Sequence, residues 1–184
     1  MGLDMYIYRV SKPHLSDTEI YLRNDIDGVI LPEDETDNPM YCQLAPYLQP
    51  VQVKNEYYNM EKIREDFGLS SKAHICSYSA DGIAVWDNGV EKRVTISVSD
   101  VEDKYTVEKV EKSYVCNLER VHYWRKEYDV QEWFHDNLSA DYIENCGYYI
   151  LSEELIEDFN ESFNEYIEPE KPDEESALFY HEWY

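Results

Sequence analysis

The sequence predicts an α+β domain in which an antiparallel sheet, built from an N-terminal strand and a central meander, packs against C-terminal helices. Three observations predict this class. Apolar and polar residues alternate at the N-terminus, Asp-Gly and Asn-Gly turns separate β-rich runs in the middle, and apolar residues recur every three or four positions in the last third. The 184 residues, 43% of them hydrophobic, predict a single domain over 1–184, and their number also fits one domain with an appended helical subdomain.

The N-terminal third begins with a strand and continues into a loop region. Leu3, Met5 and Ile7 alternate with polar and aromatic residues, which is typical of a strand with one buried face. Residues 25–50 hold four prolines and an acidic run. Because proline removes a backbone donor and fixes φ, we expect an exposed, acidic, proline-rich loop there.

The middle of the chain predicts one short helix and then a meander. Asn55 is expected to cap a helix that ends before Gly68, since asparagine favours the N-cap and glycine the left-handed position after a helix. Between residues 73 and 117, turns at Ser79–Gly82 and Asp87–Gly89 separate β-rich runs, because Asp-Gly and Asn-Gly supply the positive φ angles of tight hairpins.

The C-terminal third predicts helices and a tail. Over 121–168 the apolar spacing is helical, apart from a short strand at Tyr148–Leu151. Ser152 is expected to cap the last helix, which Pro169 ends. Residues 169–184 are expected to form an acidic tail with an aromatic end.

The composition points to a folded protein with a positively charged partner. Forty Asp and Glu against sixteen Lys and Arg give a formal net charge of −24, while an aromatic content of 15% argues against disorder. The field of such a surface repels nucleic acid and anionic membranes and attracts basic surfaces. The net charge equals that of about 40 Å of duplex DNA, a length close to the expected diameter of the domain. We therefore expect no direct nucleic-acid binding and no membrane binding.

The candidate binding residues are the acidic residues of the last helix and of the proline-rich loop. They are Glu153, Glu154, Glu157, Asp158, Glu161, Glu165 and Glu168 together with Asp34, Glu35 and Asp37. Like charges four residues apart destabilise a helix, so the helical face is kept at an energetic cost. The alternative is an acidic face that serves only solubility.

An enzyme is the second hypothesis. Asp87, Glu102, Asp103 and Lys104 have the acidic spacing of metal-dependent nucleases, in which carboxylates hold Mg²⁺. Acidic residues are so frequent in this chain that the spacing arises by chance, and a nuclease needs a positive groove. We expect no catalytic residue, no metal and no cofactor.

Cysteines and tyrosines give weaker indications. The four cysteines lie 30 or more residues apart, which excludes the usual zinc spacings and predicts buried, reduced thiols. The eighteen tyrosines exceed what a core of this size needs, and tyrosine is frequent at interfaces. A homodimer, or a structural or assembly role in an oligomer, is therefore a third hypothesis.

Four parts of the sequence form a recognisable pattern: the opening MGLDMYIY, the segment Tyr123–Lys126 with Trp133 and Phe134 after it, Cys146–Tyr149 before Ser152–Leu155, and the ending Tyr180–Tyr184. Together they resemble a family of small, largely uncharacterised phage and prophage proteins. Residues 25–116 have no counterpart, and Glu127 and Tyr128 replace the usual Ala-Asn. The resemblance implies a phage or mobile-element origin and no particular reaction.

The resemblance and the acidic surface together lead to one functional expectation. The chain is expected to be a phage-encoded inhibitor that mimics nucleic acid and binds a basic nucleic-acid-binding protein of the bacterial host, as anti-CRISPR and other anti-defence proteins do. No stretch of the sequence has the length of apolar residues that a membrane span or signal peptide requires, so we expect it in the cytoplasm of the host cell.

Overall fold

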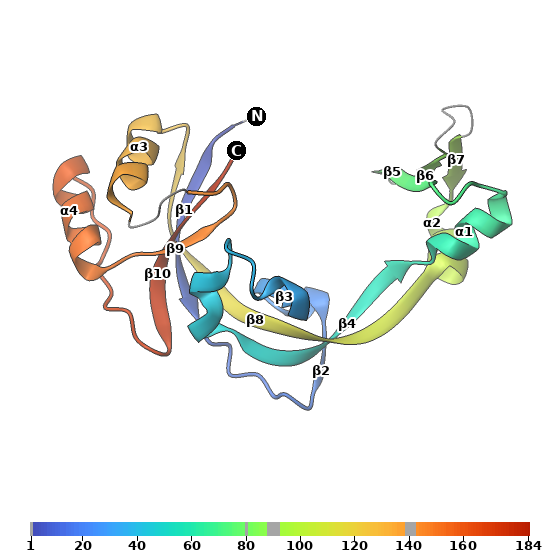
Figure 1. Ribbon diagram of the computed structural model, residues 1–184, viewed down its shortest axis with the longest axis horizontal. Coiled ribbons are helices and arrows are strands. Elements are labelled where there is room, and N and C mark those ends of the chain that lie inside the picture. The colour runs from blue at the N-terminus through green and yellow to red at the C-terminus, as the bar shows by residue number, and fades with distance from the viewer. Residues whose placement is uncertain (1, 80, 88–92, 139–142) are drawn as a thin grey trace. The chain divides into compact units, whose positions relative to one another are not determined.

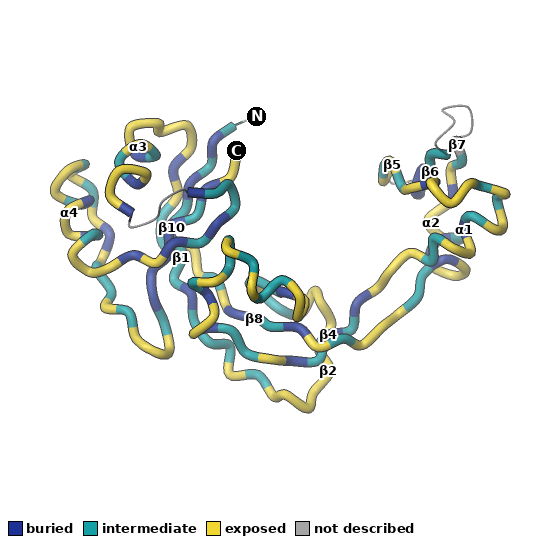
Figure 2. Tube along the Cα trace, in the orientation of Figure 1, coloured by how far each residue is buried: buried dark blue, intermediate teal, exposed yellow. Residues whose placement is uncertain are grey.

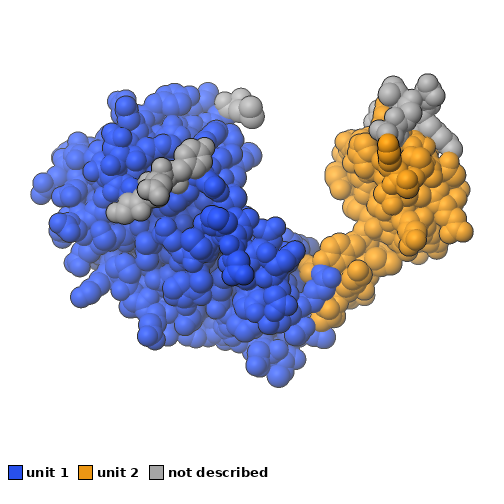
Figure 3. Space-filling model, in the orientation of Figure 1, with its two compact units in different colours: residues 1–53, 111–184 blue, residues 54–110 orange. Residues whose placement is uncertain are grey.

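The computed structural model describes residues 2–79, 81–87, 93–138 and 143–184, and the chain is an α+β protein with 41% strand. It divides into two compact units, shown in Figure 3: unit 1 comprises Met1–Val53 with Glu111–Tyr184, and unit 2 comprises Lys54–Val110. Each unit has a hydrophobic core of its own. The chain therefore forms two units where the sequence predicted one domain.

A seven-stranded sheet forms the centre of unit 1, in the order β2-β4-β8-β1-β10-β9, with β3 also paired to β8. The strands are β1 (Asp4–Ser11), β2 (Ile20–Leu22), β3 (Gly28–Pro32), β4 (Gln49–Tyr58), β8 (Thr106–Arg125), β9 (Tyr148–Ile150) and β10 (Ser176–Trp183). The predicted N-terminal strand is confirmed as β1, which is antiparallel to both β8 and β10. β4 and β8 also extend into unit 2.

Two helices, α3 (Tyr128–Asn137) and α4 (Glu153–Phe163), pack on one face of this sheet (Figure 1). Between helices and sheet lies an aromatic core, in which the Phe134 ring stacks on Tyr180 of β10 with centroids 4.2 Å apart and on Phe159 of α4 at 5.0 Å. Each fully buried side chain of this size contributes about 1.5–3 kcal/mol relative to exposure. The aromatic core thus fixes both helices to the strands.

Local signals set the ends of α4. The Ser152 hydroxyl oxygen accepts a hydrogen bond from the Leu155 amide at 3.1 Å, so the predicted N-cap is confirmed. The helix ends earlier than predicted, because Asn164 adopts a left-handed conformation with φ of 52°. The Asn160 side chain then hydrogen-bonds both the amide and the carbonyl of Ile167, at 2.8 and 2.6 Å, and directs that residue into the core.

Three predicted segments differ from the structure of unit 1. Residues 25–50 include β3 and 3-10 turns at Glu33–Glu35 and Cys42–Tyr47, where a loop was expected. Val121–Arg125, expected in a helix, is the end of β8. The expected tail over 169–184 contains β10, whose residues Ala177–Tyr180 are fully buried because the strand has neighbours on both sides and is covered on both faces.

Unit 2 contains a separate three-stranded sheet of β5 (His74–Ser79), β6 (Gly82–Trp86) and β7 (Arg93–Ile96). The predicted meander of 73–117 is divided between the two sheets: β5, β6 and β7 form this separate sheet, whereas its last part belongs to β8 of the large sheet, which pairs with the N-terminal strand β1. The first hairpin is confirmed. The second predicted turn, Asp87–Gly89, extends outside the described residues.

Helical segments complete unit 2. The helix α1 (Met60–Phe67) is capped by Asn59, whose side-chain oxygen accepts from the Lys62 amide at 3.0 Å, and it ends at Gly68 with φ of 58°. The cap predicted at Asn55 is wrong, because that residue is buried within β4. The segment α2 (Val98–Asp100) continues as a helical turn over Val101–Tyr105, whose first and last residues pack with the core.

Among the described residues, no helix combines the length and the apolar composition needed to cross a membrane. The four cysteines are free thiols, but only Cys116 is buried, and burial raises its pKa to about 12. Cys42 and Cys76 are exposed and Cys146 is half-buried, so the expectation that all four are buried is wrong.

Candidate functional site

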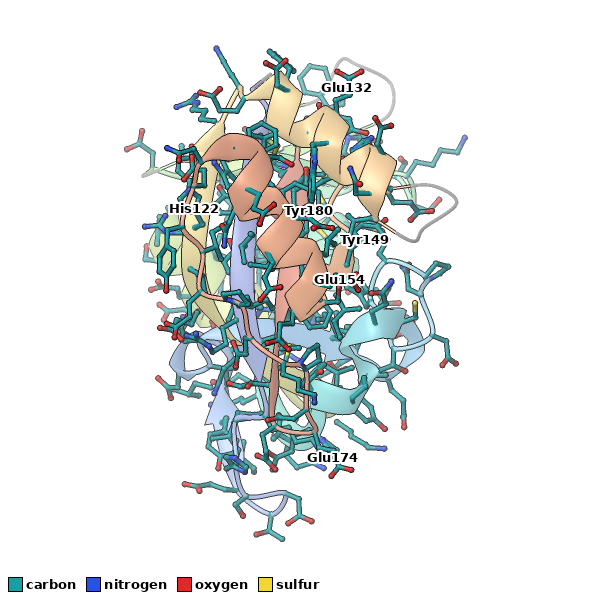
Figure 4. The ribbon with its side chains drawn as sticks, turned by 90° about the vertical axis from the view of Figure 1, so that its left-hand side faces the viewer. His122, Glu132, Tyr149, Glu154, Glu174 and Tyr180 are labelled. Atoms are coloured by element: carbon teal, nitrogen blue, oxygen red, sulfur yellow. The ribbon has the colours of Figure 1, made fainter. Side chains whose placement is uncertain are left out.

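The outer face of α4 is an acidic surface of unit 1. Its carboxylates form two rows with a spacing of four residues, and all of them are exposed. The first row is Glu153, Glu157 and Glu161, and the second is Glu154 and Asp158. Figure 2 shows the buried and exposed sides of the helix, and Figure 4 shows Glu154 with Glu132 of α3 and Glu174 on the same side of unit 1.

These five carboxylates differ from other acidic residues of unit 1 in their ion pairing. Within the described part of the chain, no Lys, Arg or His side chain forms an ion pair with any of them. Other carboxylates of unit 1 are paired: Arg9 binds Glu119 and Glu170 at 2.7 and 2.8 Å. The negative charge of the α4 face is therefore not neutralised by described side chains.

The charge spacing on α4 is close to that of a nucleic-acid strand. The eleven residues of the helix extend for about 16 Å at 1.5 Å per residue. Five carboxylates over this length give about one charge per 3 Å, and one DNA strand carries one phosphate per about 3.4 Å. The helix can therefore present negative charges to a basic groove at the density that a single strand would present.

The remaining predicted residues of the C-terminal part lie after the helix. Glu165 is half-buried, and its carboxylate lies 3.7 Å from His122 Nε2. It is therefore less accessible to a partner than the exposed carboxylates of α4. Glu168 is exposed. The structure thus brings together five of these seven acidic residues on the helix and places the other two in the segment that follows it.

The acidic residues of the proline-rich segment do not join this face. They follow β3, which lies away from α4 in Figure 1. Asp34 and Asp37 are exposed, while Glu35 accepts a hydrogen bond from the Asn38 amide group at 2.9 Å. The adjacent Glu33 pairs with Lys112 at 2.8 Å, and this hydrogen bond lowers the pKa of Glu33. Asp34, Glu35 and Asp37 are thus a separate group from the α4 carboxylates.

The net charge is distributed very unevenly between the units. Unit 2 has eight Lys and Arg against eleven Asp and Glu, a formal charge of −3, and the rest of the chain therefore carries −21 of the total of −24. The acidic surface inferred from the whole-chain composition is a property of unit 1.

A buried carboxylate beneath α3 was missed by the sequence analysis. Glu182 of β10 is fully buried, and its side chain accepts hydrogen bonds from Tyr180 at 2.8 Å and Gln131 at 3.1 Å and contacts His135 Nε2 at 3.0 Å. Burial raises the pKa of Tyr180, with a further contribution from Glu182. The one signal in the sequence was the apolar run Ala177–Tyr180, which is typical of a strand buried on both faces.

Tyrosines gather on the opposite face of the sheet. By the alternation of β1, Tyr6 lies opposite to the core residues Met5 and Ile7, and its ring stacks on Tyr8 with centroids 5.3 Å apart. His181 and Tyr148 continue this stack, with centroids 4.4 Å apart. These residues are half-buried, so packing within the sheet accounts for much of their aromatic surface.

The residues of the nuclease hypothesis do not form a metal site. Asp87 accepts hydrogen bonds from the Ser70 amide and hydroxyl, at 3.1 and 2.5 Å. Lys104 pairs with Asp100 at 3.1 Å, and Glu102 is exposed. No group of three or more His, Cys, Asp or Glu that could hold a metal ion is found among the residues that the structure describes.

No protein-family model, curated protein or solved structure matches the chain.

Proposed function

We propose that this chain is a non-catalytic binding protein that occupies the nucleic-acid-binding surface of a basic bacterial protein. The observation that carries the proposal is the α4 face, on which five exposed carboxylates lie in two rows without a basic partner among the described residues. The phage origin rests on the sequence resemblance alone, and the inhibitory role rests on that resemblance together with the acidic composition.

The way in which α4 is held supports this proposal. Its inner face, with Ile156 and Phe159 fully buried, anchors the helix in the core. The outer carboxylates are therefore attached to a rigid element before any partner arrives, which reduces the entropy lost on binding. Electrostatic complementarity of this kind acts mainly on association rate and specificity, so affinity should depend strongly on salt.

The test is capture of partners from a nuclease-treated bacterial lysate on the immobilised protein, at low and high salt. The test variant carries Glu157→Lys, Asp158→Lys and Glu161→Lys, at positions that are exposed and outside the core. The control variant carries Glu61→Lys, Glu65→Lys and Asp103→Lys, which are exposed in unit 2 and change the net charge by the same amount.

We expect the wild type and the control variant to capture nucleic-acid-binding proteins at low salt and to release them when duplex DNA or salt is added. The α4 variant should capture them poorly, because its face repels a basic groove. Equal capture by the α4 variant and the wild type, or failure of DNA to compete, would contradict the proposal.

A further inference from the structure

Unit 2 contains a pocket of about 310 Å³ that has no role in the function proposed above. Its lining comes from β4, β5, β6, α2, the helical turn Val101–Tyr105 and the start of β8, so residues far apart in the sequence meet there. Its volume is at the lower end of the range of ligand sites, about 300–1,000 Å³. A pocket of this size accommodates one side chain more readily than a nucleotide or another large ligand.

Tyrosine rings form the walls of this pocket. Tyr58 and Tyr78 face each other with ring centroids 5.9 Å apart, and both are exposed, Tyr78 to 67%. Tyr57 lines the same pocket, and the chain's own Lys109 places its Nζ 5.6 Å from the centroid of that ring. One tyrosine of the wall is therefore already in cation–π geometry with an ammonium group.

Two carboxylates complete the lining. Glu56 and Glu102 are exposed and lie at the pocket, and neither forms an ion pair within the described part of the chain. Burial, together with the charge of Tyr78 and Glu56, raises the pKa of Tyr58, so its phenol stays protonated and neutral at physiological pH. Every formal charge on residues lining the pocket is negative.

We propose that this pocket binds the guanidinium group of an arginine side chain presented by a partner protein. Carboxylates select a cation, and aromatic walls select one that is weakly hydrated and planar, which describes guanidinium better than ammonium. Carboxylates oppose a phosphate-bearing ligand. The pocket brings only two carboxylates together and belongs to no metal-binding group among the described residues, which opposes a hard metal ion.

The close approach of β6 to β7 beside the pocket requires a glycine. Gly82 has φ of 134°, and a Cβ there would lie 1.7 Å from the Ile96 carbonyl oxygen. A side chain at this position would separate β6 from β7 and disturb the adjacent pocket. The shape of the site thus depends on local strand pairing and not on the acidic face of α4.

The test is an NMR titration of the labelled full chain with N-acetyl-arginine amide, using N-acetyl-citrulline amide as the neutral isostere and N-acetyl-lysine amide as the alternative cation. We expect arginine to shift the amides of Ser79, Gly82 and Thr106, lysine to bind more weakly and citrulline not to bind. Tyr78→Ala and Glu102→Gln should each weaken arginine binding by about fivefold, the factor that corresponds to about 1 kcal/mol.

Matched controls are Tyr166→Ala, an 81% exposed tyrosine in unit 1, and Asp103→Asn, an exposed acid next to Glu102 that does not line the pocket. Both should bind arginine as the wild type does. The proposal is overturned if arginine causes no shifts, if citrulline or lysine binds as tightly, or if the controls weaken binding as much as the pocket variants. Capture from lysate through α4 tests the other proposal separately, because the α4 variant leaves this pocket unchanged.

Discussion

Among single residues, Glu182 stands out as a fully buried carboxylate in unit 1. Its side chain has no exposed surface, and an isolated buried carboxylate costs several kcal/mol unless hydrogen bonds replace its water. Tyr180, Gln131 and His135 make those contacts, and two of them come from α3. The carboxylate thus fixes α3 to β10 in addition to the packing of the core.

A substitution of Glu182 should therefore lower the free energy of unfolding more when it removes more of these hydrogen bonds. Glu182→Leu leaves the tyrosine hydroxyl and the glutamine amide without an acceptor, and we expect a loss of about 2–4 kcal/mol in the free energy of unfolding. Glu182→Gln retains an acceptor oxygen and should cost less. Urea denaturation measures both, with Glu132→Leu on the exposed face of α3 as the control. Equal losses for Leu and Gln would show that hydrogen bonding to this side chain contributes little.

His181 predicts the pH dependence of stability. Burial lowers its pKa, although the Gly147 carbonyl and Glu182 act in the opposite direction. In the pH range between the lowered folded pKa and the ordinary pKa of about 6.5, the unfolded chain binds the proton and the folded chain does not. The contribution of His181 to the free energy of unfolding is therefore complete above about pH 6.5 and is lost as the pH falls through the folded pKa.

The measurement is the free energy of unfolding of the wild type and of His181→Phe between about pH 7.5 and about pH 5, values chosen to span the usual range of histidine titration. Phenylalanine keeps the ring that stacks on Tyr148 but does not titrate. The wild type should lose more stability than the variant as the pH falls. Parallel profiles for the wild type and His181→Phe would contradict the assignment.

At the scale of elements, α4 has one face fixed by the core and another free to carry charge. Glu157 has a glutamate four residues away on each side, Glu153 and Glu161. Glu157→Gln removes both repulsions, and we expect the free energy of unfolding to rise by about 0.5 kcal/mol while partner capture weakens. Thermal unfolding measures the first effect, with Glu168→Gln, exposed beyond the helix, as a control. If Glu157→Gln instead lowered the free energy of unfolding, repulsion among these carboxylates would not be destabilising the helix.

The sequence predicted this helix well because its signals are local. The apolar spacing gives the period, and Ser152 gives the start, so the outward carboxylates follow from geometry alone. Signals that depend on pairing were missed. β10 lies in an acidic segment and is a strand because β1 and β9 flank it, and the end of β8 was assigned to a helix because aromatic spacing there fits both periods.

The same distinction holds for the candidate sites. The α4 face could be predicted because one helix forms it. The hydrogen bonds of Glu182 and the pocket could not, because they depend on which distant segments become neighbours: Tyr78 of β5 meets Tyr58 of β4 only in the folded unit. The helix α1 is capped by Asn59 and not by Asn55, because β4 extends to Tyr58 and includes Asn55. Even a local capping signal is therefore misplaced when the length of the preceding strand cannot be predicted.

In the whole molecule, the net negative charge lies almost entirely in one of the two units. Unit 1 carries −21 and unit 2 only −3 of the total. A charge needed only for solubility has no reason to concentrate in one unit, whereas a charge that binds a basic groove must be concentrated on one surface. Unit 2 contributes an aromatic and acidic pocket in place of an extended acidic face.

The most direct measurement of the central claim is the dissociation constant of the captured partner as a function of salt, for the wild type and for the α4 variant with its unit 2 control. In a plot of the logarithm of affinity against the logarithm of salt concentration, we predict a steep slope for the wild type and the control. The slope of the α4 variant should be shallower, because the substitutions remove charge attraction that salt screens. Identical slopes for the wild type and the α4 variant would contradict the claim that this face binds a basic surface.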